Sequence, residues 1–421
     1  MYLISVFVVL IFLHSLLSSR MERTVVTAPI VFTTAGALAL FFLPASPDRE
    51  GGQHFFLSIA ELGLVLLLFS DAYRTDLRAL RSFRSLPVRL LSIGMLLTIL
   101  LGLLWALAVL PGLSLWEAGI LAAILAPTDA GLGQIIVNSP RVPMKIRQAL
   151  NVEAGLNDGL SVPFLLFFIA LAGGGAETGH SSLIKYIVEQ LGYGALVGLG
   201  IGFVGGRLLG EAHRRRWTGH MWLQLGTLAL PLLCLLASEA VHASMFIAAF
   251  IGGMAAQAGF KSGGEADAIE FTEHAGQLFN LSVFFLFGLL VARVWDQLDA
   301  RHLLYAALSL TVVRMLPVVI SLIGTRLSAA TILFMGWFGP RGLASIVLGL
   351  VYLEHASPQP GEATIRLAVM ATVLCSIFAH GLSALPGMKL YARHLATLPR
   401  SAPEFDASES EALETEVVVQ H

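Results

Sequence analysis

Long apolar segments alternate with short polar loops from the N-terminus to residue 386. A helix needs about 20 mostly apolar residues to cross a bilayer, and about 13 segments meet this requirement. The pattern predicts an all-α polytopic membrane protein. The predicted spans are 2–19, 25–43, 55–72, 88–110, 115–137, 146–172, 183–206, 221–241, 243–260, 270–291, 302–324, 328–353 and 363–386.

Composition supports this class. Of 421 residues, 56% are hydrophobic and only 13% are charged, and the mean hydropathy is +0.78. Soluble domains carry about 25% charged residues. The formal net charge of −2 gives no reason to expect a nucleic-acid partner. We therefore interpret residues 1–386 as one transmembrane domain and residues 387–421, which are rich in Asp and Glu, as a short, disordered cytoplasmic tail.

The basic residues predict the orientation. If the N-terminus lies outside, most of the 26 Lys and Arg residues fall in loops on the cytoplasmic side. Because cytoplasmic loops of membrane proteins are enriched in these residues, we expect the N-terminus outside and the C-terminus inside. Several of these arginines are expected to contact anionic lipids. Asp71, which precedes Arg74 and Arg78, is expected to pair with them at the cytoplasmic end of its span.

A glycine-rich segment, 192–206, occupies the seventh span. Gly200, Gly202 and Gly205 have the spacing of a dinucleotide fingerprint, but no strand precedes them, so we expect no nucleotide cofactor. Glycines at this density favour close helix packing, either in a linker between two halves of the protein or in a dimer contact.

Two predicted spans are interrupted near their middle. In span 115–137, Pro127 lacks an amide hydrogen and is followed by Thr128 and Asp129. In span 328–353, the sequence GWFGPRG at 336–342 places glycines, a proline and Arg341 at a similar depth. Unwound backbone is tolerated there only when it lines a cavity or is buried in protein.

The two interruptions occupy matching positions. With the seventh span set aside as a linker, six spans precede it and six follow, and the fifth of each set is broken. The linker adds one crossing, so the two sets have opposite orientations. Paired interrupted spans in inverted repeats indicate the central site of a transporter. Asp129 is predicted to offset the positive N-terminal ends of the crossed half-helices and Arg341 the negative C-terminal ends. The alternative is that both line the pore wall.

The sequence NVEAGLND, residues 151–158, places charge within the sixth span. Asp158 falls near mid-membrane, where a carboxylate must bind a proton or a cation. A site that holds either ion, but not both, is sufficient for exchange. Asn157 and Thr128 supply neutral oxygens, which suit a hard cation such as Na⁺. Because residue 157 is an amide, one acid titrates at this pair, and one cation for one proton moves no net charge.

A second charge in this stretch, Glu153, requires a partner if it is buried. Arg314 is an isolated arginine in the eleventh span, TVVRMLP. Because a buried arginine needs a carboxylate, we predict a structural Glu153–Arg314 ion pair that orients the turn at 157–158. The alternative is that Glu153 lies near the cytoplasmic end and is solvated.

Together these motifs resemble the monovalent cation/proton antiporter superfamily, in particular the NhaP-like sodium/proton antiporters related to the animal NHE exchangers. The matching segments are PTD at 127–129, EAGLND at 153–158, Arg314 in its span, GWFGPRG at 336–342 and SIFAHGLSALPG at 376–387. The resemblance implies thirteen helices in two inverted repeats, a homodimer, and a mobile core domain that moves against a dimerisation domain.

The resemblance also implies site roles. Asp158 would bind the exchanged ion with the help of Thr128, Asn157 and Glu153, and Asn at position 157 would accompany electroneutral exchange. It implies the ion pair between Glu153 and Arg314 as well. One departure is Ala154, where the family often has Ser, so one hydroxyl ligand is missing and the preference between Na⁺ and K⁺ stays open.

The sequence therefore predicts a secondary-active Na⁺ (or Li⁺)/H⁺ antiporter in the plasma (inner) membrane, not an enzyme, and without a cofactor. The nearest alternative is a K⁺/H⁺ antiporter of the same fold. Alternatives from other classes are a proton-linked transporter of an organic anion and a membrane sensor without transport.

Overall fold

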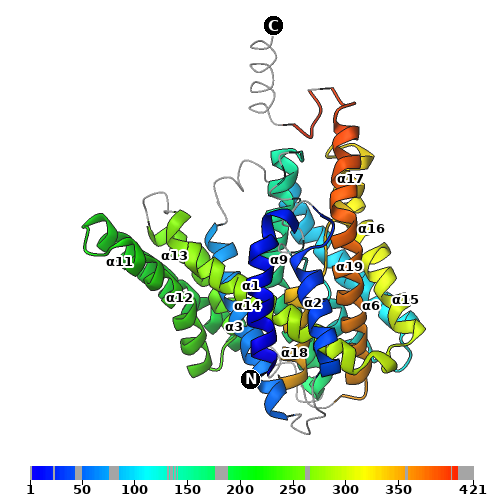
Figure 1. Ribbon diagram of the computed structural model, residues 1–421, viewed down its shortest axis with the longest axis horizontal. Coiled ribbons are helices and arrows are strands. Elements are labelled where there is room, and N and C mark those ends of the chain that lie inside the picture. Colours follow the sequence, from blue (N-terminus) through cyan, green and yellow to red (C-terminus); the bar gives the residue numbers. More distant parts are fainter. Residues whose placement is uncertain are drawn as a thin grey trace.

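The computed structural model describes the chain except for residues 1, 22–23, 43–49, 75–84, 130–131, 133–135, 137–138, 140, 176–187, 261–265, 356–358, 400 and 406–421. The described residues form helices and no β-strand (Figure 1). The α-helices are α1 (Tyr2–Met21), α2 (Ala28–Ala39), α3 (Glu50–Arg74), α5 (Ser85–Arg89), α6 (Met95–Val109), α7 (Leu115–Ile124), α9 (Met144–Ala170), α11 (Gly194–Arg214), α12 (His220–Ala240), α13 (Met245–Phe260), α14 (Ala266–Arg293), α15 (Ala300–Leu310), α16 (Val312–Ser321), α17 (Ala329–Trp337), α18 (Leu343–His355) and α19 (Glu362–Leu395). Short 3₁₀ or π-helical turns lie at Leu40–Phe42, Leu90–Gly94, Leu171–Gly175, Val188–Tyr193 and Trp295–Gln297.

The helices follow the predicted spans. Among the described residues, nine helices are long and apolar enough to cross a membrane, and four further apolar helices are shorter. Each predicted span contains at least one of these helices. The chain is thus a multi-pass membrane protein. The number of crossings and the inverted relation between the two halves stay predictions.

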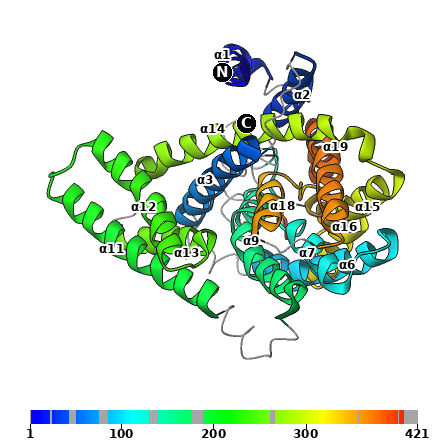
Figure 2. The same ribbon diagram turned by 90° about the horizontal axis from the view of Figure 1, so that it is seen from below.

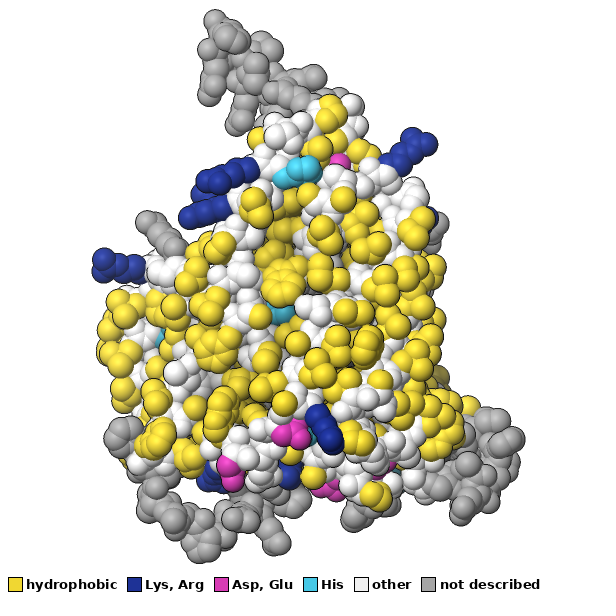
Figure 3. Space-filling view, turned by 90° about the vertical axis from the view of Figure 1, so that its right-hand side faces the viewer, with side chains coloured by type: hydrophobic (Ala, Val, Ile, Leu, Met, Phe, Trp, Pro, Cys, Tyr) yellow, Lys and Arg dark blue, Asp and Glu magenta, His cyan; other side chains and the backbone are white. Residues whose placement is uncertain are grey.

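The exterior has the distribution expected of a membrane-embedded surface. Hydrophobic side chains cover most of the face shown in Figure 3, and charged side chains gather toward its two ends. The long helix α1 has no buried residue. Lipid is as apolar as such a helix, so exposure of leucine and phenylalanine here has no hydrophobic cost.

Seen along the helix bundle, the helices form two groups (Figure 2). One contains α3, α11, α12 and α13. The other contains α6, α7, α9, α15, α16, α18 and α19, and α14 runs alongside both groups. The interrupted helices lie in the second group, so this group contains the backbone breaks that the sequence analysis identified.

The glycine-rich helix α11 packs on α13. Gly194, Gly198, Gly202, Gly206 and Gly210 are all buried and recur at every fourth position along one face. A methyl group added at Gly202 would lie 2.2 Å from the carbonyl oxygen of Gly252 on α13. The glycines therefore allow the two backbones to touch, which confirms the interpretation as close helix packing within the chain.

The end of the transmembrane domain differs from the prediction. Helix α19 continues through Leu395 instead of ending at 386, and residues 401–405 fold back onto the helices. Glu404 is buried, whereas the sequence predicts a disordered tail from residue 387. The rest of the predicted tail, 406–421, lies outside the described residues. Hydrogen bonds from a distant segment fix Glu404, which local composition does not indicate.

Candidate functional site: a crossing of two interrupted helices

Two backbone breaks meet at the centre of the second helix group. Helix α7 ends at Ile124 before Pro127, and α17 ends at Trp337, before the irregular segment 338–342 and the start of α18. The Asp129 amide donates a hydrogen bond to the carbonyl oxygen of Pro340 at 2.8 Å. The two unwound segments are therefore in direct contact, as the matching interruptions predict.

Asp129 caps free backbone amides on both sides of this crossing. Its Oδ2 accepts from the Leu343 amide, the first residue of α18, at 2.7 Å, and its Oδ1 accepts from the Leu132 amide at 3.3 Å. A methyl group at Gly342 would lie 1.9 Å from Oδ2, so glycine is required for this approach. A carboxylate at helix N-termini satisfies free amides and the positive end of the dipole. These contacts are the ones that the predicted charge-compensating role of Asp129 requires, and that role stays a prediction.

Arg341 binds the opposite kind of helix end. Its Nη1 donates to the carbonyl oxygens of Ala126 and Pro127, just past the end of α7, at 2.6 and 3.0 Å. Its backbone amide donates to the Ser376 hydroxyl on α19 at 2.7 Å. Arg341 is fully buried, so its guanidinium group offsets the negative C-terminal end of α7 inside the protein. The pore-wall alternative fits neither charged residue.

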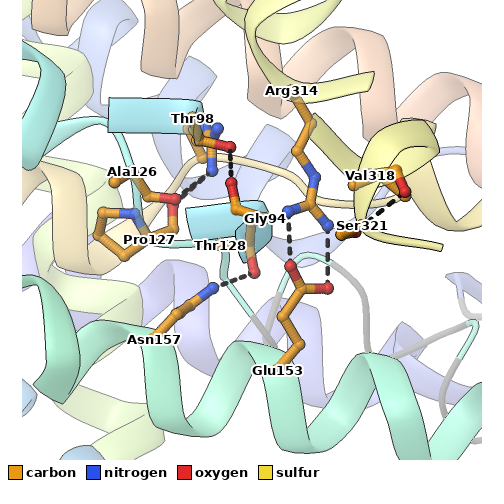
Figure 4. Close-up of polar contacts among 11 residues, drawn as sticks. Gly94, Thr98, Ala126, Pro127, Thr128, Glu153, Asn157, Arg314, Val318 and Ser321 are labelled. Carbon is orange, nitrogen blue, oxygen red and sulfur yellow. Dashed lines mark hydrogen bonds and ion pairs between the residues drawn. The ribbon is translucent and has the colours of Figure 1, made fainter. Parts of the chain in front are cut away.

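A buried ion pair lies beside the crossing (Figure 4). Arg314 on α16 donates from Nη1 and Nη2 to the two carboxylate oxygens of Glu153 on α9, at 2.5 and 2.9 Å. Both side chains are buried, so the alternative of a solvated Glu153 is wrong. A methyl group at Gly339 would lie 2.2 Å from Arg314 Nε, so the glycine in the α17–α18 break leaves room for the guanidinium. The pair fixes α9 against α16 and the break.

One helical turn further along α9, Asn157 faces the other break. Its Nδ2 donates to the Thr128 hydroxyl at 2.7 Å, and both residues are buried (Figure 4). Asn157 Oδ1 is buried and accepts no hydrogen bond from the described residues. The same holds for Oδ1 of the neighbouring Asp158, whose side chain as a whole is partly exposed. The site thus leaves a carboxylate oxygen and an amide oxygen without a donor from the part of the chain that the structure describes.

Asp71 is an acid near this site that the sequence did not place there. Arg74 forms an ion pair with Glu273 of α14. Arg78 lies outside the described residues, so the pairing of Asp71 with these two arginines stays a prediction. Asp71 also approaches α9, because a methyl group at Gly155 would lie 3.3 Å from its β-carbon. The pairing prediction for Asp71 considered only residues close to it in sequence. Nothing in the local sequence indicates that α3 packs against α9.

The sequence matches a family of known proteins. The family model described as "Sodium/hydrogen exchanger, transmembrane" matches residues 3–389. The chain belongs to this family. The match includes every residue of the crossing described above, and it places the chain among transporters, as the motifs at the two breaks indicated.

Several curated relatives are similar over long stretches. A Na⁺/H⁺ antiporter of Schizosaccharomyces pombe is 25% identical over 369 residues, covering 79% of this chain and 77% of the relative. A sodium, potassium, lithium and rubidium/H⁺ antiporter of Bacillus subtilis is 29% identical over 281 residues, 65% of this chain and 40% of the relative. A K⁺/H⁺ antiporter, NhaP, of Alkalimonas amylolytica is 26% identical over 344 residues, 80% and 57%. The chain therefore spans about half the length of several relatives.

A solved structure shares the fold. The sodium/proton antiporter MjNhaP1 of Methanocaldococcus jannaschii, determined at pH 8, superimposes with a TM-score of 0.71 at 21% identity, covering 90% of this chain and 99% of that one. At this identity the likeness establishes the architecture only. It supports the all-α polytopic membrane fold predicted from the apolar segments.

Proposed function

We propose that the protein is a secondary-active antiporter that exchanges a monovalent cation, Na⁺ or Li⁺, for a proton by alternating access. Asp158 carries this proposal. It is a partly exposed carboxylate on a membrane-spanning helix, and its buried Oδ1 accepts no hydrogen bond from the described residues. Such a group is stabilised either by a proton or by a cation, and the two compete for the same oxygen atoms.

The other acids of the crossing are less suited to exchange. Both oxygens of Glu153 accept from Arg314, and both oxygens of Asp129 accept backbone amides. Protonating either one would leave buried donors unsatisfied, at a cost of about 1–3 kcal/mol for each lost partner. These carboxylates therefore have structural roles in the proposal, and Arg341 neutralises the remaining helix end.

Oxygen ligands set the class of the cation. Asn157 Oδ1 is buried beside Asp158, and the Thr128 hydroxyl is joined to Asn157. Oxygen donors suit hard cations such as Na⁺. The alternative of K⁺/H⁺ exchange stays open, because Ala154 removes a hydroxyl ligand and because the Alkalimonas amylolytica relative is named a K⁺/H⁺ antiporter.

Stoichiometry and topology complete the proposal. Asn157 is an amide, so one proton at Asp158 exchanges for one cation and transport is electroneutral. The N-terminus lies outside and the C-terminus in the cytoplasm of the plasma (inner) membrane, because the basic loops then face the cytoplasm. A homodimer and contacts with anionic lipids are also proposed. An organic anion is disfavoured, because the guanidinium groups of Arg314 and Arg341 already bind acceptors of the protein.

Exchange in reconstituted vesicles tests the proposal. Purified protein with a trapped pH-sensitive dye is challenged with Na⁺, Li⁺ and K⁺ across pH, with and without an imposed voltage. We expect cation-dependent proton movement that does not depend on voltage and is abolished in Asp158→Asn. Normal exchange by Asp158→Asn would refute the assignment of the ion-binding acid. A voltage-dependent rate would refute electroneutrality.

A further inference from the structure

The N-terminal ends of the two half-helices that lead into the crossing are built alike. Helix α7 begins after Ser114, whose hydroxyl accepts a hydrogen bond from the Glu117 amide. The Glu117 carboxylate in turn accepts a hydrogen bond from the Ser114 amide at 2.8 Å. The other oxygen of Glu117 accepts from the Gly361 amide at the start of α19, at 2.7 Å. A buried carboxylate thus caps α7 and ties it to α19.

Helix α17 begins in the same way after Ser328, whose hydroxyl accepts from the Thr331 amide. The third helical residue is here Thr331, so α17 lacks the carboxylate that Glu117 supplies to α7. The missing group comes from the end of the chain. Glu404 Oε1 accepts from the Ser328 amide at 2.7 Å and from the Thr331 hydroxyl at 3.0 Å, and Glu404 is 1% exposed.

The segment that carries Glu404, residues 401–405, also contacts α9. Lys145, in the first turn of α9, donates from Nζ to the carbonyl oxygen of Pro403 at 2.6 Å. Phe405 packs against an apolar cluster that includes Ile146 of α9 and Phe334 of α17. The segment therefore joins the N-terminal ends of the two helices that lead to the proposed ion site and to the break beside it.

We infer that residues 401–405 form a strap and that Glu404 is a positioning residue for cation exchange, acting through α17. This inference rests on the proposed function. By capping α17, Glu404 fixes the helix that ends at the break, where Gly339 adjoins Arg314 and Gly342 adjoins Asp129. The family match ends at residue 389, so the strap lies outside the segment common to the family.

The chain supplies its own rescue experiment. Glu404→Ala removes the carboxylate, and adding Thr331→Glu restores it in cis, as a Ser-x-x-Glu capping box like that of α7. Glu404→Gln keeps the size but loses the charge, and so remains informative if the alanine variant does not fold. Glu211→Gln is the matched control, because Glu211 is an exposed glutamate at the end of α11 that pairs only with Arg214 and Arg215 among the described residues.

Two measurements apply to each variant: hydrogen exchange of the α17 amides, and the cation concentration that gives half-maximal exchange. In Glu404→Ala and Glu404→Gln we expect the hydrogen-exchange rate of the α17 amides and the half-maximal cation concentration each to rise about fivefold. This factor corresponds to the loss of one helix cap. The maximal rate should be retained, and Thr331→Glu should restore both quantities in the alanine background. Glu211→Gln should change neither.

Opposite outcomes would overturn the inference. Unchanged hydrogen exchange of the α17 amides in both Glu404 variants would show that the strap does not hold this helix. Faster hydrogen exchange of these amides with an unchanged half-maximal cation concentration would reduce Glu404 to a stabilising contact. A folded double variant without rescue would exclude the capping account. If the wild-type protein exchanges no cation, the proposed function fails instead. If the wild type is active and the Glu404 variants behave like it in both measurements, only the inference fails.

Discussion

The Glu153–Arg314 pair gives the sharpest test of the site's architecture. Replacing either residue with alanine leaves the other charge buried without its partner, because each is less than 5% exposed and the pair shares hydrogen bonds at 2.5 and 2.9 Å. Breaking a buried pair in this way costs about 3–5 kcal/mol. Removing both residues eliminates both the attraction and the desolvation of the charges.

We therefore expect the double variant to lose about as much stability as either single variant. The coupling free energy should be about 3 kcal/mol, near a hundredfold in the ratio of folded to unfolded protein. Thermal unfolding of purified protein in one detergent, for wild type, Glu153→Ala, Arg314→Ala and the double variant, measures this coupling.

A matched control comes from the same helix. Leu165 on α9 is 1% exposed and lies twelve residues from Glu153, about 18 Å along the helix axis. Leu165→Ala should destabilise through a cavity, and its effect should add to that of Arg314→Ala. If the Glu153 and Arg314 losses are additive as well, the two charges do not stabilise each other, and the pair does not serve as the strut that orients the turn at 157–158.

Further predictions concern two glycines and the strap. Gly342→Ala should abolish most cation exchange in folded protein, because its methyl group would lie 1.9 Å from Asp129 Oδ2. Gly349→Ala on α18 should be tolerated in the same vesicle assay, because the nearest atom to its methyl group would lie at 3.5 Å. Gly202→Ala should lower unfolding stability by about 2 kcal/mol through overpacking, whereas Gly200→Ala, with no atom within 4 Å, should not. Burial raises the pKa of Glu404, but hydrogen bonds from Ser328 and Thr331 outweigh it and hold the pKa below the ordinary 4.5. Its stabilisation should therefore be complete above that pH and be lost as pH falls through the folded-state value, as protection of α17 in pH-dependent hydrogen exchange would report.

The helices and the two backbone breaks could be predicted because their signals are local. Apolar length predicted the helices, and Pro127 with the glycines at 336–342 predicted the breaks. Glu153 was proposed as the partner of Arg314 because an unpaired arginine within a span is costly and a carboxylate can neutralise it. Each of these inferences needs only burial and charge, which sequence reveals well in a membrane.

Contacts that depend on how distant helices pack were not predicted. Asp71 was considered only with its sequence neighbours Arg74 and Arg78, and its approach to Gly155 on α9 was not foreseen. Glu404 was assigned to a disordered tail by composition, but it caps a helix that begins more than seventy residues earlier. Glu404 thus satisfies a requirement of another element, and its own neighbours in sequence carry no trace of that requirement.

Charge balance is the reason why we propose only one acid of the crossing, Asp158, for ion exchange. Glu153 and Arg314 cancel each other, and Asp129 and Arg341 each neutralise helix ends of the opposite sign. These groups bind permanent features of the fold, so their protonation states need not change during transport. Asp158 adds one negative charge to this balanced cluster and has a buried oxygen with no donor among the described residues. Because the surrounding charges are balanced, the stability of the Asp158 carboxylate depends on the proton or cation that it binds. Without Arg341, the free C-terminal end of α7 would itself attract a cation. Arg341→Met should therefore weaken the competition between cation and proton, seen as a smaller shift of the half-maximal cation concentration with pH. An unchanged shift would mean that the helix ends do not influence the ion at Asp158.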